Sequence, residues 1–371
     1  MIRPTVARVD LDAIRANLQA IASFVGAAAR PPQIIAVVKA NAYGHGAVEV
    51  ARALESAGAA MLACADIEEG VVLRRGGVRA PILIFGALGV SDLEGVFTHT
   101  LTPTISTPSA ARALEAGAAR HRTTLHCHLK IDTGMNRLGF RSDNLAHSIP
   151  GIAASPHLAI DAVYTHFATA DNPEHPMFGD QRDRFEAALA EMPSLGVTTR
   201  LHHAANSAAL LRDERVWYDF VRPGLLLYGI VPPPLAALLP LQPALSLHSR
   251  IVAVKGLRPG EGTGYGMTTV FDRPTTVAVV PAGYADGLDL RLAGRGHMLV
   301  RGRRAPIVGS VCMDMTMIDV TGTDAAPGDD VVILGRQDDE MMDVREMAAA
   351  IGTIPYELLC RVGARIQRVY E

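Results

Sequence analysis

A lysine directly follows a short apolar run near the start of the chain. The run spans residues 34–38 and ends at Lys39, after which residues 40–46 turn the chain into a helical pattern. Burial disfavours the charged form of an amine and lowers its pKa from about 10.4, toward the range in which it attacks an aldehyde. Schiff-base chemistry is therefore one hypothesis for Lys39. Phosphate binding and an ion pair in the core are alternatives that the spacing leaves open.

Two later segments offer hydrogen-bond donors to an anion. Residues 203–207 read His-Ala-Ala-Asn-Ser, and residues 222–225 read Arg-Pro-Gly-Leu; both follow expected strands. Ser207 can donate its hydroxyl, and Gly224 allows close approach of the backbone. In (β/α)8 barrels, phosphates commonly bind to the loops after the seventh and eighth strands. A phosphate site is thus one interpretation, and an Asx-type turn with a helix cap is the other.

A tyrosine among glycines, Tyr265 in the run Gly-Thr-Gly-Tyr-Gly, is a candidate acid or base. A phenol has an ordinary pKa of about 10, so it needs a nearby donor or cation to act as a base. Taken alone, a tyrosine in such a run is more typical of an exposed turn.

One strand pattern carries several polar side chains. Strand alternation places His126, His128, Lys130 and Asp132 on one face. A metal site is a formal alternative there, but histidines two residues apart in a strand are usually interior polar residues, and we expect no metal.

The elements that must position these residues follow a repeating pattern. Between residues 33 and 222, short β-rich runs alternate with Ala-rich helical patterns such as 47–57 and 181–192. The eight expected strands are 34–38, 61–64, 82–85, 101–105, 125–131, 160–166, 200–203 and 219–222. This pattern favours an N-terminal (β/α)8 TIM barrel, although a doubly wound open sheet would share it.

A proline run at residues 232–234 marks a change in character and a hinge. We place the domain boundary near residue 240, with domains 1–240 and 241–371. Beyond it, the runs 245–254, 276–280, 297–301, 307–320 and 331–334 alternate in polarity between Gly-rich turns and predict a mainly antiparallel β domain. Only residues 344–351 look helical there. The predicted fold class is α/β plus β.

The composition is that of an ordinary globular protein. Of the 371 residues 49% are hydrophobic and 20% charged, and the net charge of −3 offers no long-range attraction to nucleic acid. No stretch approaches a membrane span, and the N-terminus does not read as a signal peptide. The four cysteines form no CxxC pair, so we expect reduced thiols and a cytoplasmic protein.

Residues 37–46, Val-Val-Lys-Ala-Asn-Ala-Tyr-Gly-His-Gly, resemble the pyridoxal 5′-phosphate (PLP) attachment motif of bacterial alanine racemases. The resemblance extends along essentially the whole chain. It implies a PLP-binding (β/α)8 barrel, a C-terminal β domain that carries the second catalytic base, and a homodimer that interconverts L- and D-alanine. It further implies that Lys39 carries PLP, that Tyr43 contacts the phosphate and that the product supplies peptidoglycan.

The resemblance also assigns the other cofactor contacts. An arginine, here Arg222, lies against the pyridine nitrogen, which should stay unprotonated because a guanidinium only donates hydrogen bonds. We expect His203 to orient that arginine by a hydrogen bond, and packing in the core is the alternative for this lone histidine. The remaining cofactor-binding residues that the resemblance implies are Asn206, Ser207, Gly224, Leu225 and Tyr356.

The two proton-transferring groups follow from the same comparison. Lys39 removes the α-proton of D-alanine, and Tyr265, supplied by the opposite subunit, removes that of L-alanine. His166 matches the histidine that contacts this tyrosine and can relay charge toward Arg222.

The substrate site is implied by two motifs. Residues 130–139, Lys-Ile-Asp-Thr-Gly-Met-Asn-Arg-Leu-Gly, match the segment whose arginine, here Arg137, binds the substrate carboxylate, steadied by Lys130, which is often carbamylated in this family. The second motif is Cys312-Met313-Asp314, in which the backbone of Met313 lies near that carboxylate. Tyr356 narrows the entrance, and the weaker candidates for the access corridor are Tyr284, Arg291 and Asp171.

Three other functions are compatible with parts of this pattern. A broad-specificity or serine racemase of the same fold differs only in the shape of its pocket. PLP-dependent decarboxylases of basic amino acids share the architecture, but their long Gly-rich phosphate loop is missing here. The single-domain PLP homeostasis proteins share the lysine and lack a domain that carries Tyr265.

Overall fold

The computed structural model describes residues 4–88, 92–199, 201–235 and 238–371. The chain forms two compact units. The barrel unit comprises Ala13–Ala42 and Ala47–Gln242, and the β unit comprises Met1–Asp12, Tyr43–Gly46 and Pro243–Glu371.

Eight parallel strands close the barrel unit into a ring. They follow the order β5-β4-β3-β2-β10-β9-β8-β6, and a pairing between β5 and β6 completes the circle. The strands are β2 (Gln33–Val37), β3 (Met61–Cys64), β4 (Ile82–Ile84), β5 (Thr102–Ile105), β6 (Leu125–Asp132), β8 (Leu158–Tyr164), β9 (Leu201–Asn206) and β10 (Phe220–Arg222). The short β7 (Phe140–Arg141) pairs with β6. The predicted (β/α)8 barrel is confirmed; Arg200, with which one expected strand began, lies outside the described residues.

The barrel strands are buried on both faces, as parallel strands covered by helices must be. Four of the five residues of β2 and all three of β4 are buried. Their short, nearly continuous apolar runs explain why sequence alone located them within a few residues.

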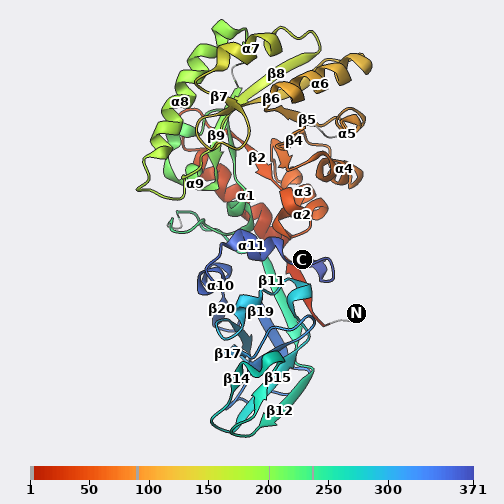
Figure 1. Ribbon diagram of the computed structural model, residues 1–371, viewed down its shortest axis with the longest axis vertical. Coiled ribbons are helices and arrows are strands. Elements are labelled where there is room, and N and C mark those ends of the chain that lie inside the picture. Colours follow the sequence, from red (N-terminus) through yellow and green to blue (C-terminus); the bar gives the residue numbers. More distant parts are fainter. Residues whose placement is uncertain (1–3, 89–91, 200, 236–237) are drawn as a thin grey trace. The chain divides into compact units, whose positions relative to one another are not determined.

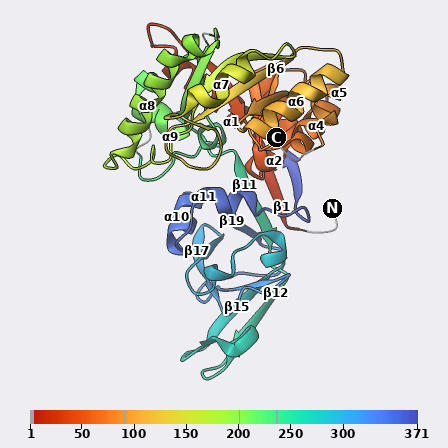
Figure 2. The same cartoon turned by 45° about the horizontal axis from the view of Figure 1, so that its top comes forward.

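The helices of the barrel unit surround the strands (Figures 1 and 2). They are α1 (Leu11–Val25), α3 (Ala47–Ser56), α4 (Ile67–Arg75), α5 (Glu94–Thr98), α6 (Pro108–Arg120), α7 (Leu145–Ala153), α8 (Met177–Glu191) and α9 (Ser207–Arg212). Side chains of Asp66, Thr107 and Asn206 accept from backbone N–H groups at the starts of α4, α6 and α9. The short 3-10 turns are η1 (Met192–Leu195), η2 (Glu214–Val216) and η3 (Leu225–Tyr228).

The β unit is built on a ten-stranded sheet. Its order is β12-β15-β18-β17-β16-β19-β11-β1-β21, with β20 paired to β19. The strands are β1 (Val6–Val9), β11 (Leu245–Arg250), β12 (Ala253–Leu257), β15 (Thr275–Val280), β16 (His297–Val300), β17 (Arg303–Val308), β18 (Thr316–Asp319), β19 (Asp330–Gln337), β20 (Glu340–Met342) and β21 (Gln367–Tyr370). A small hairpin joins β13 (Gly262–Thr263) to β14 (Thr269–Val270). All neighbours in the main sheet are antiparallel except β1 and β21.

Three features of the β unit differ from the sequence analysis. First, β1 pairs with β11 and β21, so residues 1–12 group with this unit rather than with the barrel, where the predicted boundary had placed them. Second, the runs 245–254 and 307–320 each form two strands, because the chain changes partner between β11 and β12 and leaves the sheet between β17 and β18. Third, α11 (Pro355–Cys360) follows α10 (Val344–Ala350); its six residues are too few to show a helical period.

The described helices include none with both the length and the apolar character needed to cross a membrane.

Candidate active site

Lys39 emerges from the carboxyl end of β2, the end at which barrel enzymes build their active sites. The backbone N–H of Val37 donates to the carbonyl oxygen of Pro223 at 3.0 Å, and that of Val38 donates to Ala63 at 2.8 Å. The strand that delivers Lys39 is therefore tied to its neighbour β3 and to the segment that follows β10.

The turn after Lys39, labelled α2 (Lys39–Tyr43), is left-handed. Ala40, Asn41, Ala42 and Tyr43 all have φ between 52° and 53°. Left-handed backbone costs a residue with a Cβ about 1–2 kcal/mol, so other contacts must hold this turn in place.

A carboxylate that the sequence analysis missed provides one such contact. One oxygen of Glu69 accepts from Ala40 N at 2.6 Å and the other from Ala65 N at 2.8 Å. The side chain of Asn41 accepts from Ala47 N at 2.8 Å. Glu69, in the first turn of α4, thus fixes the backbone beside Lys39, but a lone glutamate in a helix carries no signal of this role in the sequence.

Arg222, the last residue of β10, is only 3% exposed and is held by four acceptors. Nη2 donates to the carbonyl oxygens of Thr165 and Ala204, both at 2.9 Å, and shares one of its two hydrogens with Nδ1 of His166 at 3.2 Å. Nη1 donates to Nδ1 of His203 at 2.8 Å. Burial lowers the pKa of Arg222 to about 10, which still leaves the guanidinium charged at neutral pH.

The histidines around Arg222 are neutral. Burial, and secondarily the nearby charge of Arg222, lowers the pKa values of His166 and His203 well below the ordinary histidine value. Because a guanidinium has no acceptor, the Nδ1 atoms that face it must be unprotonated, so both histidines carry their proton on Nε2. Within this group of three side chains only Arg222 is charged, and its orientation is fixed.

Lys130 and Arg137 contribute further positive charge near this centre. Lys130 is 6% exposed, its Nζ lies 5.8 Å from the centre of the Tyr164 ring, and the guanidinium carbon of Arg222 lies 5.2 Å from the same ring. Burial first, and then the charges of Arg137 and Arg222, lower the pKa of Lys130 to about 8. The charge of Lys39 acts in the same direction on Lys130 and on His166, so these side chains share one region of the barrel unit.

The loops after β9 and β10 form a set of donors. Ser207 Oγ accepts from Gly224 N at 2.9 Å, which leaves the hydroxyl hydrogen of Ser207 available to donate. Asn206 accepts from Ala209 N at 2.9 Å at the start of α9. In the part of the chain that the structure describes, the backbone N–H of the buried Leu225 has no acceptor. Hydroxyl and amide donors gathered in this way suit an anion.

The other predicted residues, except Asp171, lie in the β unit. The rings of Tyr43 and Tyr356 are 5.9 Å apart, centre to centre. Tyr265 is 77% exposed, and its carbonyl oxygen accepts from the hydroxyl of Ser310 at 2.8 Å. Its side chain is thus presented to the outside of the unit from an anchored loop, in which Gly264 and Gly266 have positive φ.

The segment Cys312-Met313-Asp314 packs against the loop that contains Tyr284. The carbonyl oxygens of Cys312 and Met313 accept from Tyr284 N and Ala285 N at 3.0 and 3.1 Å. A Cβ at Gly283 would collide with both carbonyl oxygens, so the close approach requires glycine there. Asp314 accepts from Arg365 at 2.7 Å.

The predicted corridor residues separate into two groups. Tyr284 and Arg291 line one hollow of about 670 Å³ in the β unit, and Arg291 is bound there by Asp289 at 2.7 Å. Asp171 is an exposed residue of the barrel unit.

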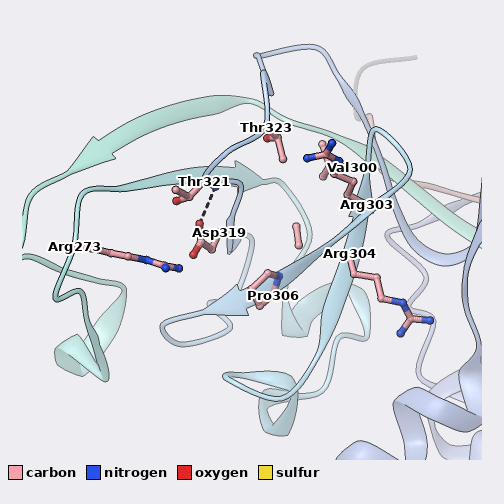
Figure 3. A pocket seen from close by; sticks show the side chains of 9 residues that line it. Arg273, Val300, Arg303, Arg304, Pro306, Asp319, Thr321 and Thr323 are labelled. Carbon is pink, nitrogen blue, oxygen red and sulfur yellow. Dashed lines mark hydrogen bonds between the residues drawn. The ribbon is translucent and has the colours of Figure 1, made fainter.

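A different hollow of about 400 Å³ opens on the strands of the β unit (Figure 3). Its walls include Arg273, Arg303, Asp319 and Thr321, and none of the predicted site residues. Its arginines are exposed.

Comparison with known proteins extends over both units. Models of the N-terminal and C-terminal domains of alanine racemase match residues 9–232 and 244–370. The alanine racemase of Symbiobacterium thermophilum is 42% identical, with 100% of this chain and 97% of that protein aligned, and that of Carboxydothermus hydrogenoformans is 41% identical with both chains fully covered.

Solved structures give the same result. The alanine racemase of the D-cycloserine producer Streptomyces lavendulae has a TM-score of 0.95 at 36% identity and covers 100% of this chain and 98% of that one. The Bacillus anthracis alanine racemase, solved with bound L-Ala-P, has a TM-score of 0.92 at 36% identity, with coverage of 100% and 96%.

Agreement along both units defines the class: the chain is an isomerase, an amino-acid racemase built from a closed barrel and an antiparallel β domain. Within that class it belongs to the alanine racemase family, which it matches along its full length. The single-domain homeostasis proteins are thereby set aside, because they have no counterpart of the second match.

Proposed function

We propose that this racemase uses PLP to interconvert L- and D-alanine by a two-base mechanism. It acts in the cytoplasm as a homodimer and supplies D-alanine for peptidoglycan. The observation that carries the proposal is the buried Arg222, whose guanidinium is fixed by four acceptors in the region that contains Lys39.

The residues present fit PLP. Within the described residues none accepts a hydrogen bond from Nε of Arg222, so this guanidinium retains a donor for the pyridine nitrogen. The hydroxyl of Ser207 and the backbone N–H of Leu225 are donors for the phosphate, and Tyr43 and Tyr356 add two phenols. Lys39 would carry the aldehyde carbon on Nζ.

When bound, PLP supplies the electron-withdrawing ring that acidifies the α-proton of an amino acid. Arg222 limits that withdrawal, because a charged guanidinium donates to the ring nitrogen and does not protonate it. Arg222 thereby favours return of the proton to the α-carbon over transamination.

The α-proton is exchanged by two groups on opposite faces. Lys39 Nζ takes it from D-alanine, and the phenolate oxygen of Tyr265 takes it from L-alanine. A phenol needs a donor to become a base near neutral pH. His166 meets this need, because its Nδ1 is occupied by Arg222 and its Nε2 carries the proton that can be donated to the phenol.

The substrate carboxylate is held by Arg137 and by the backbone of Met313. Arg137 offers two parallel N–H groups to the two carboxylate oxygens. Lys130 steadies Arg137 in its carbamylated form, and its lowered pKa supports this modification because a neutral amine is the form that reacts with CO2.

Tyr265 acts on the active site of the opposite subunit. Its high exposure on an anchored loop supports this, since such a phenol is ready to meet another surface. Cys312 and Asp314 support the Met313 backbone, and Tyr284, Arg291 and Asp171 line the path of the substrate.

The test is racemisation of L-alanine in D2O by the purified protein with added PLP. We expect D-alanine labelled at Cα and visible absorbance from the bound cofactor, both lost in Lys39→Ala and kept in the matched control Lys255→Ala, an exposed lysine of β12. Cofactor absorbance without racemisation of alanine would refute the proposed reaction.

A further inference from the structure

A third histidine, His128 of β6, is linked to Arg222 through His203. His203 Nε2 lies 2.9 Å from His128 Nδ1, and His203 Nδ1 lies 2.8 Å from Arg222 Nη1. The three side chains are 0–3% exposed, so water does not compete for these bonds. They form a continuous chain of hydrogen bonds inside the barrel.

The direction of each bond in this chain follows from the arginine. A guanidinium can only donate, so His203 Nδ1 accepts and the proton of His203 is on Nε2. That Nε2–H must then donate, and His128 Nδ1 accepts it. His128 is neutral at pH 7, since burial lowers its pKa to about 4.

Apart from Arg222 and His128, the neighbours of His203 fix its ring but not its tautomer. Its ring stacks on Tyr164 with the centres 4.5 Å apart and the planes 12° apart, and the Tyr164 hydroxyl is paired with Thr104 at 3.0 Å. These contacts fix the plane of the ring. They do not determine which nitrogen carries the proton, because either tautomer can stack on Tyr164 in the same way.

We propose that His128 is a positioning residue for Arg222: by accepting from His203 Nε2–H, it stabilises, together with Arg222, the tautomer in which His203 Nδ1 can hold the guanidinium. The alternative tautomer would direct an N–H of His203 at an N–H of Arg222. This inference rests on the proposed function in one respect: the proposed cofactor is what Arg222 would contact.

The direct test is neutron diffraction from crystals of the deuterated protein as purified. We expect deuterium on Nε2 of His203 and none on Nδ1. Deuterium on Nδ1 of His203 would overturn the inference whether or not the protein racemises alanine, and so separates this proposal from the proposed function.

A pair of variants tests the consequence. His128→Asn keeps an acceptor oxygen near the place of Nδ1, whereas His128→Leu keeps the bulk and removes the acceptor. Loss of one neutral hydrogen bond corresponds to about a tenfold change in rate. We expect His128→Leu to lower kcat about tenfold at nearly constant KM, to shift the visible spectrum of the bound cofactor and to raise transamination; His128→Asn restores all three.

The control is His126→Leu on the same strand. His126 is largely exposed and pairs with Asp161, so kcat and the spectrum should stay unchanged. If His128→Asn and His128→Leu behave alike, or if only their stability falls, His128 is merely structural and the proposal fails.

Discussion

Replacing Lys130 with methionine should stabilise the barrel unit at neutral pH in CO2-free buffer. Burial, Arg137 and Arg222 lower the pKa of Lys130 from 10.5 to about 8. This difference corresponds to a penalty of about 3 kcal/mol for holding the charged amine in the folded protein. Methionine has a similar length and no charge, so Lys130→Met should recover up to about 3 kcal/mol of unfolding free energy.

The gain in unfolding free energy from Lys130→Met should depend on pH. Below pH 8 the lysine is charged in both states and the penalty is fully present. As the pH rises from 8 to 10.5, the folded state has lost its proton while the unfolded state still binds one, so the parent gains stability. The advantage of Lys130→Met should therefore shrink across this window and vanish near its upper end.

The assay is urea unfolding at fixed protein concentration, followed by the fluorescence of Trp217, the single tryptophan, which is buried in the same unit. Lys255→Met at an exposed site is the control. Bicarbonate should stabilise the parent and not Lys130→Met, because the carbamate removes the buried cation. A stability difference that stays constant from pH 7 to pH 10.5 would refute the reasoning.

Four further outcomes are expected. Tyr265→Ala should lose α-deuterium exchange with L-alanine by about 100-fold or more and retain part of the exchange with D-alanine, as measured by NMR in D2O; equal losses would reject the two assigned bases. Arg222→Glu should increase transamination relative to racemisation in a half-reaction assay, and unchanged partitioning would count against the role of Arg222. Glu69→Ala should weaken cofactor retention more than Glu69→Gln, which keeps one acceptor for the turn after Lys39; dialysis followed by absorbance measures this, and equal retention would show that the turn holds without Glu69. L-Serine should turn over slowly, since a slightly larger side chain costs only about 1–3 kcal/mol; serine faster than alanine would favour the broad-specificity alternative.

Much of the barrel was predictable because its signals are local. Strands such as β2 and β4 are short buried apolar runs, and the residues at or just after the ends of β2, β9 and β10 stand out in type: Lys39, Asn206 and Arg222. Strand ends of a parallel barrel meet on one face, so these positions indicate a common site before any contact is known.

The β unit was less predictable because its pairings connect distant parts of the chain. Nothing in the four residues of β1 shows that their partners are β11 and β21, more than two hundred residues away. The breaks at the ends of β11 and β17 likewise depend on which strand lies alongside, and alternation of polarity does not reveal a change of partner.

Sequence by itself determined the family, the barrel and the residue types available for chemistry. Tertiary structure alone decided how those residues are held: the left-handed turn after Lys39, the carboxylate of Glu69 that fixes it, and the chain from Arg222 through His203 to His128. The physical reason is that residue type and spacing specify local conformation, whereas hydrogen-bond direction, burial and pKa depend on atoms that only folding brings together.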